Sequence, residues 1–572
     1  MKFFFIRIYI LLYFFTMFIV TTDTFAKNTK TKYTNKDISN YFVGILSSKD
    51  ENNEKALKHL KKVKSLSKSH TQYNIEYIRT LVLLEKFQEA FAFSESVWKE
   101  DELFFSADLL IGLNYFLKQD YKKADKFFQR LNRVTLYNIY FKDFIGNILL
   151  AWSSALQGNQ EDSFKFIKKI PKQYSNLKNT QDVFLKCYFN SSDTKKSFEK
   201  LIGIKGYNFS RYNFFLINYL IHNDKVEESK TIIKNISQKS ASNLLMKETK
   251  NLILTNQNNK IKNFFNCKNP ADSIAELFYV ISSLYASENE YPLSNFYLKI
   301  SLFLNDKFLA NKTLLAENFF YQKKNDLSKK IYLSLKEIGP EYSWYAAKNV
   351  ATILSETKGE KDSIDSIKND FNLLSNPNFE HYYDLANFYK DNGYYKESIR
   401  YYSIALKKIK KDHVLVSKIL DRRGTSYERI NDWEKAEKDL LESLKISPDQ
   451  PNVLNYLAYS WVDKGINLNK GLVMLKKALK LKKNDAYIID SLGWAYYAKK
   501  NYEEAEIFLQ RAVELLPSDP VINDHYADTL WMLNKKIQAR YFWNYILNID
   551  DIEKNLKENI NKKLILGIKK NI

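Results

Sequence analysis

The sequence predicts an all-α fold made of stacked helical hairpins, and three observations support this prediction. The first is a period: small residues recur 34 positions apart, at Ala56, Ala90 and Ala124, at Ser294 and Ser328, and at Ala505 and Ala539. A fixed period of this length is typical of repeats in which two helices pack together and each pair stacks on the next. The other two are compositional: glycine and proline are scarce (14 and 9 residues), whereas tyrosine and phenylalanine are abundant (40 and 39). Tight β-turns are therefore not expected, and large rings are available to fill hairpin interiors.

The clearest single unit covers Ala486–Asp519, and each of its marker residues has a physical role. Gly493, at the eighth position, lets the first helix approach the second closely. Ala505, at the twentieth, lies where the second helix crosses nearest, so a larger side chain would overpack the contact. Tyr496 is expected to fill the hairpin interior, and Pro517 lies past the second helix and helps to end it.

This pattern resembles the tetratricopeptide repeat, a helix–turn–helix unit of 34 residues. With a small residue fixed at the twentieth position, twelve repeats are found, and ten of the twelve also carry a small residue at the eighth. The residues at the twentieth position are Ala56, Ala90, Ala124, Ser163, Ser229, Ser294, Ser328, Ser398, Ala436, Gly471, Ala505 and Ala539. The resemblance implies a tetratricopeptide-repeat α-solenoid, a right-handed superhelix of about twelve helical hairpins.

The strength of the pattern varies along the chain and divides it into six segments. These are a signal peptide at 1–26, an N-terminal array at 27–177, degenerate helical repeats at 178–274, a repeat pair with a decayed repeat at 275–376, a C-terminal array at 377–550, and a capping helix at 551–572. Trp344 and Ala351 mark the decayed repeat. The capping helix is expected to cover the last apolar face of the array with one side, formed by Leu556, Ile560, Leu564 and Ile565.

Residues 1–26 have the order of a secretory signal. Lys2 and Arg7 supply positive charge, Ile8–Val20 is an apolar run too short for a typical spanning helix, and Thr24–Ala26 offers small residues for cleavage. An uncleaved membrane anchor is the alternative. The leader has no cysteine for lipid attachment, so in a Gram-negative host we expect a periplasmic chain, free or peripherally associated with a membrane.

Cys187 and Cys267 are the two cysteines of the chain. Export would permit a disulfide between them. Both lie in the least regular part of the repeat pattern, however, and the sequence favours two buried single thiols. No CxxC pair is present, so zinc binding and thioredoxin-like chemistry are not expected.

The net charge of +22 and the few histidines do not favour nucleic-acid binding, metal binding or catalysis. The lysines are dispersed and form no arginine-rich stripe, so we interpret them as solvated helix faces and expect no nucleic-acid partner. Six histidines are scattered without metal-ligand spacing, and no phosphate-binding or nucleophile motif occurs. Asp524 and His525 are adjacent and would point about 100° apart on a helix, which does not form a dyad. The chain is therefore predicted to be no enzyme and to need no cofactor or metal.

The predicted binding site is the concave groove that first helices line in tetratricopeptide arrays. Family geometry places nine candidate residues there: Asn452, Asn455, Tyr459, Tyr487, Asp490, Trp494, Asp524, Asp528 and Trp531. Such a groove would be acidic and aromatic, with amides and carboxylates for a peptide backbone or its lysines and with flat rings for apolar contact. The alternatives are that the aromatic residues pack between repeats and that the carboxylates are solvated surface. Lys418 and Arg422 are in reach for a carboxylate clamp, but their neighbouring repeats offer acids.

Three runs between Asn452 and Leu547 resemble a narrower group: 454–459 (LNYLAY), 489–494 (IDSLGW) and 519–525 (DPVINDH). They look like exported proteobacterial tetratricopeptide proteins, which include outer-membrane lipoprotein adaptors of a periplasmic C-terminal-processing protease. The resemblance implies an exported scaffold or adaptor that binds protein segments, with a periplasmic protease or an envelope assembly complex as partner. An envelope-assembly factor that binds peptidoglycan or exported polysaccharide is the alternative. The oligomeric state stays open.

Overall fold

The computed structural model describes residues 33–133, 141–204, 211–235, 243–549 and 552–568, and this part of the chain is all-α. It contains 31 α-helices and two short 3₁₀ helices, and no strand occurs in these residues. The predicted fold class is therefore confirmed. The predicted signal peptide at 1–26 lies outside the described residues. No helix within them is long and apolar enough to span a membrane.

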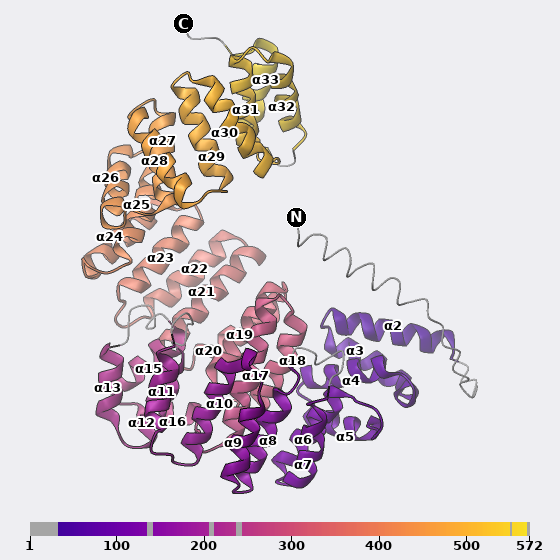
Figure 1. The fold of residues 1–572 in the computed structure, drawn as a ribbon. Helices are drawn as coiled ribbons and strands as arrows, with labels where there is room; N and C mark the ends of the chain where they lie inside the picture. Colours follow the sequence, from indigo (N-terminus) through magenta and orange to yellow (C-terminus); the bar gives the residue numbers. More distant parts are fainter. Residues whose placement is uncertain (1–32, 134–140, 205–210, 236–242, 550–551, 569–572) are drawn as a thin grey trace. The chain divides into compact units, whose positions relative to one another are not determined.

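The chain forms two compact units, Met1–Lys324 and Asn325–Ile572 (Figure 1). The α-helices of unit 1 are α2 (Asn35–Lys49), α3 (Asn53–Leu60), α4 (Thr71–Leu83), α5 (Phe87–Val97), α6 (Phe105–Leu117), α7 (Tyr121–Arg130), α8 (Ile145–Leu156), α9 (Gln160–Lys169), α10 (Ser175–Tyr188), α11 (Thr194–Ile202), α12 (Tyr212–His222), α13 (Val226–Asn235), α15 (Leu244–Leu254), α16 (Asn258–Phe264), α17 (Pro270–Ser287), α18 (Tyr291–Leu304) and α19 (Leu309–Tyr321).

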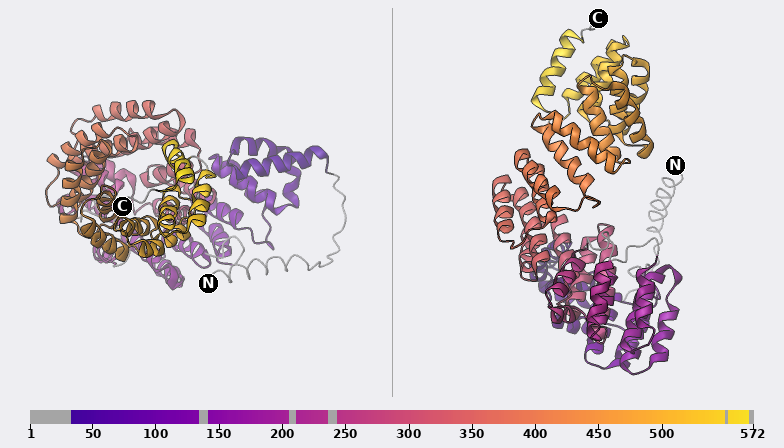
Figure 2. Two further views of the ribbon diagram at one scale, coloured as in Figure 1. Left: turned by 90° about the horizontal axis from the view of Figure 1, so that it is seen from above. Right: turned by 90° about the vertical axis from the view of Figure 1, so that its left-hand side faces the viewer.

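Unit 2 continues the pattern of paired helices, which follow one another along an arc (Figure 2). Its α-helices are α20 (Asn325–Leu335), α21 (Pro340–Thr357), α22 (Glu360–Asn372), α23 (Phe379–Asp391), α24 (Tyr395–Lys408), α25 (Val416–Arg429), α26 (Trp433–Ile446), α27 (Pro451–Asp463), α28 (Leu468–Leu481), α29 (Ala486–Ala498), α30 (Tyr502–Leu515), α31 (Pro520–Met532), α32 (Lys536–Leu547) and α33 (Lys554–Leu566).

The small residues lie where the two helices of a hairpin touch. Ala505 is fully buried, and a Cβ added to Gly493 would lie 2.6 Å from Cγ of Leu509 on the partner helix. The turn between the two helices also repeats: Lys500 and Asn534, 34 residues apart, both take a left-handed backbone with φ of 62° and 64°. The period in the sequence thus marks a packing contact and a turn, both of which each hairpin must reproduce.

The sequence pattern missed two hairpins, α10–α11 and α15–α16, and marked a third, α21–α22, only as a decayed repeat. The last of these contains the predicted decayed repeat and is regular in structure. Ser363 lies on α22, and its Oγ donates a hydrogen bond to the carbonyl of Ala351 on α21. These two small residues stand twelve positions apart, the same separation as the eighth and twentieth positions of the clear repeats.

The prediction of two free thiols is wrong, because Cys187 and Cys267 form a disulfide with their Cα atoms 6.0 Å apart. Helix α10 packs against α17, where the amide of Gln181 donates a hydrogen bond to the carbonyl of Ser273. This contact brings the end of α10 beside the segment that leads into α17. Lys268 also bridges the two chain segments, since its Nζ donates to the carbonyl of Cys187 over 2.7 Å. The pairing depends on contacts between repeats, which the pattern of single repeats does not reveal.

Candidate binding site

Helices α27, α29 and α31 are the last three first helices of unit 2, and we call the surface that carries the nine predicted residues the first-helix face. Neighbouring first helices contact each other, α27 with α29 and α29 with α31. The nine residues differ in exposure. Asn452 and Tyr487 are exposed, and Asn455, Tyr459, Trp494 and Trp531 are half-buried. The three carboxylates, Asp490, Asp524 and Asp528, are buried.

Asp490 is paired with a histidine of the next repeat. Nδ1 of His525 on α31 lies 2.9 Å from Oδ1 of Asp490 on α29. The imidazole stacks on the ring of Trp494 with the centroids 4.0 Å apart, and Trp494 stacks in turn on Tyr497 at 4.4 Å. Burial by itself lowers the pKa of His525, but the Asp490 carboxylate, with Asp524 and Asp528 nearby, outweighs it and raises the pKa. The contact between His525 and Asp490 therefore joins the two repeats, and the carboxylates favour the protonated form of the imidazole.

Asp524 and Asp528 bind a lysine of the last helix. The two carboxylates stand one turn apart on α31, and Nζ of Lys563 on α33 donates to Asp524 over 2.7 Å and to Asp528 over 2.8 Å. The indole Nε1 of Trp543 lies 3.1 Å and 3.2 Å from the same two carboxylates. One ammonium group thus stands against two buried carboxyl groups.

Burial beside a second carboxylate raises the pKa of Asp528 to about 7. Burial is the largest cause, because it disfavours the charged form, and the neighbouring carboxylate of Asp524 adds to it. Lys563 and His525 act in the opposite direction and offset part of the rise. The carboxyl pair therefore takes up a proton near neutral pH.

The segment that follows α33 also contacts α31. Nε1 of Trp531 donates a hydrogen bond to the carbonyl of Ile568 over 3.1 Å. Ile560 is fully buried against the core of the last hairpin, so α33 covers the end of the array. Ile565 was expected on the apolar side as well, and that expectation is wrong, because its side chain is 78% exposed.

The structure thus corrects the predicted role of three residues. Asp490, Asp524 and Asp528 are neither open to a groove nor solvated, because the fold uses them to bind His525 and Lys563. Trp494 packs between repeats, which was the alternative interpretation of the aromatic residues. Whether the nine residues bind a partner stays a prediction.

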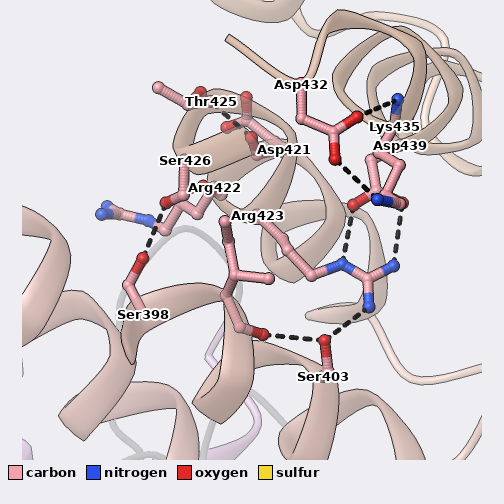
Figure 3. Close-up of polar contacts among 11 residues, drawn as sticks. Ser398, Ser403, Asp421, Arg422, Arg423, Thr425, Ser426, Asp432, Lys435 and Asp439 are labelled. Atoms are coloured by element: carbon pink, nitrogen blue, oxygen red, sulfur yellow. Dashed lines mark hydrogen bonds and ion pairs between the residues drawn. The ribbon is translucent and has the colours of Figure 1, made fainter. Parts of the chain in front are cut away.

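A second polar cluster lies on α24, α25 and α26 (Figure 3). Arg423 donates two hydrogen bonds to the carboxylate of Asp439, over 2.7 Å and 2.8 Å, and a third to Oγ of Ser403. Asp421, on the same helix, is half-buried, and no ion pair to it occurs within the described ranges. Burial raises the pKa of Asp421, although the nearby Arg422 opposes the rise. Asp421 therefore has two cations nearby, Arg422 and Lys390, but no ion pair within the described ranges.

One signal for these contacts was present in the sequence. Asp490 and His525 are 35 residues apart, which is one period plus one residue and therefore places them on neighbouring first helices. Lys563 has no such signal, because α33 lies outside the repeat register.

The comparisons with known proteins support the repeat assignment. Residues 486–519 match the family model described as tetratricopeptide repeat. The chain is 32% identical to a TPR repeat-containing protein of Pseudomonas aeruginosa over 103 residues, which are 18% of this chain and 18% of that protein. The match therefore spans less than a fifth of the relative's length.

Solved structures resemble the chain more remotely. A thermophilic TPR protein of Thermus thermophilus covers 33% of this chain and 100% of its own length, at 17% identity and a TM-score of 0.29. The APC/C hetero-tetramer Cut9–Hcn1 covers 87% of this chain and 97% of its own, at 14% identity and a TM-score of 0.36. Similarity at this level carries no functional conclusion. Residues 486–519 thus match a tetratricopeptide repeat, and paired helices continue on both sides of this match.

Proposed function

We propose that this chain is an exported scaffold of the adaptor type that binds lysine-bearing protein segments along the first helices of unit 2. Repeat arrays of this kind offer extended surfaces for protein partners. The main support for the proposal is that the chain's own α33 binds to this face. Two carboxylates of α31 hold its Lys563, and Trp531 binds the carbonyl of Ile568. The face therefore recognises a side-chain ammonium and a backbone carbonyl, which any extended or helical protein segment can present.

Asp421 and the residues of α27 provide the same chemistry without an internal ligand. Asp421 is half-buried and has no ion pair within the described ranges, so a partner's lysine would lower its pKa and stabilise the charged form. On α27, Asn455 keeps an Oδ1 atom for which the described residues offer no hydrogen-bond partner. Tyr459 lies four residues further along α27, one helical turn away, and adds a half-buried ring. These three residues are the proposed contact set.

Export is supported by the disulfide. Disulfides such as Cys187–Cys267 persist in oxidising compartments and are rare in reducing ones. Together with the predicted signal at 1–26, this favours a periplasmic location and, by resemblance, a periplasmic protease or an envelope assembly complex as partner. Sequencing the N-terminus of the protein from cell envelopes tests the export step. We expect the chain to begin at Lys27, and a chain that begins at Met1 would contradict cleavage.

A peptide array tests the binding step. Fifteen-residue peptides of envelope proteins, each printed with its lysines intact and with lysine replaced by glutamine, are probed with the folded chain. We expect binding to depend on lysine and to be lost in a variant carrying Asp421→Asn and Tyr459→Ala. The matched control is Glu434→Gln, a neutralised exposed carboxylate on the second helix α26. Binding that ignores lysine, or that survives the double change, refutes the proposal, and retention of peptidoglycan or polysaccharide in place of peptides favours the alternative function.

A further inference from the structure

A cleft of about 480 Å³ opens on the other side of the C-terminal array, between the second helices α28 and α30. Its apolar lining comes from Leu479, Leu492 and Phe508. Four cationic side chains and no carboxylate line it, the cations being Lys476, Lys480, Lys483 and Arg511. Arg511 is held at the rim because it donates hydrogen bonds to the carbonyl of Lys483 and to Oδ1 of Asn484. The cleft is therefore apolar in its walls and uniformly positive around them.

These cations differ from their neighbours because no acid neutralises them. In the described part of the chain, no ion pair forms with any of the four. By contrast, Lys477 on the same helix pairs with Asp449 over 2.8 Å, and Lys482 pairs with Asp485. Four like charges close together repel one another, and an anion placed among them removes this repulsion. The charge of the cleft thus points to a ligand that carries negative charge.

Exposed apolar side chains flank the cleft with the spacing of the repeat. Val473 on α28, Ile507 on α30 and Tyr541 on α32 are 34 residues apart and are 69%, 67% and 66% exposed. Val473 lies one turn before Lys476, and Ile507 one turn before Arg511, so each shares a helix face with a cation of the cleft. A free phosphate or an acidic peptide needs the cations alone. A lipid bilayer, whose headgroups lie above hydrocarbon, would contact both the cations and the exposed apolar side chains.

We infer that the second-helix surface of α28 and α30 binds the anionic phospholipid headgroups of a membrane. The phosphate groups lie among the four cations, and the side chains of Val473 and Ile507 enter the interfacial region. This surface lies on helices other than those that carry the proposed partner contacts, so the inference holds whether or not the first-helix face binds a partner. It gives the chain a way to stay at a membrane without a spanning helix in its described part.

Vesicle sedimentation tests the inference with the full chain. We expect binding to vesicles of phosphatidylglycerol and none to vesicles of phosphatidylcholine. Each basic residue near an anionic surface strengthens binding by about fivefold. If the four contributions add, replacing all four cations by glutamine (K476Q, K480Q, K483Q, R511Q) should therefore weaken binding by about two to three orders of magnitude. The matched control makes the same change in charge on and after α24 at four exposed lysines (K396Q, K407Q, K410Q, K411Q) and should leave binding within about twofold.

Two further arms distinguish the sources of negative charge. The pair Val473→Ser and Ile507→Ser should weaken vesicle binding, and inorganic phosphate at millimolar concentration should not displace the vesicles. Circular dichroism establishes that each variant is folded. If the fourfold variant is unstable, the pair Lys476→Gln and Lys480→Gln, whose side chains make no hydrogen bond within the described ranges, takes its place.

The following results would overturn the inference. Equal binding to both kinds of vesicle, no binding to phosphatidylglycerol, or equal loss in the control variant overturns the inference. Binding of polyglutamate but not of vesicles assigns the cleft to an acidic polypeptide and overturns it as well. Full displacement by inorganic phosphate, with no effect of the two serine substitutions, reduces the cleft to a site for small anions.

Discussion

Replacing Asp528 by asparagine should reduce the pH dependence of the stability of the last repeat. The pKa of Asp528 rises from its ordinary value of 3.8 to about 7 in the folded chain, so folding favours the protonated form. The resulting stabilisation is complete below about pH 4 and is lost as the pH rises through about 7. Between pH 8 and pH 5 it amounts to about 2–3 kcal/mol in favour of the lower pH. His525 acts in the same direction, because its pKa is raised above 6.5 and its stabilisation is lost as the pH rises through that raised value.

Hydrogen exchange of α31, α32 and α33 measures this local stability in the intact chain, after correction for the intrinsic pH dependence of exchange. In the natural protein we expect protection to increase from pH 8 to pH 5 by an amount that corresponds to about 2–3 kcal/mol. In Asp528→Asn the side chain stays neutral, so only the contribution of His525 should remain, and the variant should be the more stable protein at pH 8.

The control is Asp412→Asn, which neutralises an exposed carboxylate in the loop after α24. It should leave the pH dependence of α31–α33 unchanged. The reasoning is refuted if the natural protein is equally protected at pH 5 and pH 8, if it is better protected at pH 8, or if Asp528→Asn keeps the full pH dependence.

Three more changes test other contacts. Lys563→Met should cost about 3–5 kcal/mol, because two buried carboxylates lose their cation, and α33 should lose its exchange protection first; unchanged protection of α33 would contradict the contact. Cys187→Ser removes the bond that closes a loop of 80 residues and should lower the free energy of unfolding of unit 1 by about 4 kcal/mol. Urea denaturation of the oxidised chain measures this loss. No such loss is expected when both proteins are compared under reducing conditions. Gly493→Ala should cost about 1–3 kcal/mol in thermal unfolding, because the new Cβ meets Leu509, and a neutral result would show that the two helices can separate freely.

The helical pairs could be predicted from the sequence because each hairpin repeats the same contact between its two helices. A small residue such as Ala505 is needed where two helices cross, and the turn before it needs a left-handed residue such as Lys500. Where serine takes the place of alanine or glycine and the first helix is longer, as in α21–α22, the contact between the helices persists but the sequence pattern is weaker. Ser363 illustrates this, because it fills the crossing point and also satisfies its hydroxyl on Ala351.

The candidate site was harder to predict because its chemistry depends on contacts between repeats. The positions of Asp490, Asp524 and Asp528 on first helices followed from the register, but their burial did not. Their exposure is set by His525 of the next repeat and by Lys563 of a helix outside the register. The disulfide has the same origin, since two helices far apart in the chain bring the cysteines together.

The most direct test of the central claim, that the first helices of unit 2 bind protein segments, is site-specific photocrosslinking in cells. A photoreactive residue is placed at Tyr459 on the first-helix face or, as a control, at Glu434 on the second helix of the preceding hairpin. We predict defined protein adducts at position 459 that disappear when Asp421 is replaced by asparagine, and none at position 434. Adducts of equal yield at both positions, or adducts at 459 that persist without the Asp421 carboxylate, would contradict the claim.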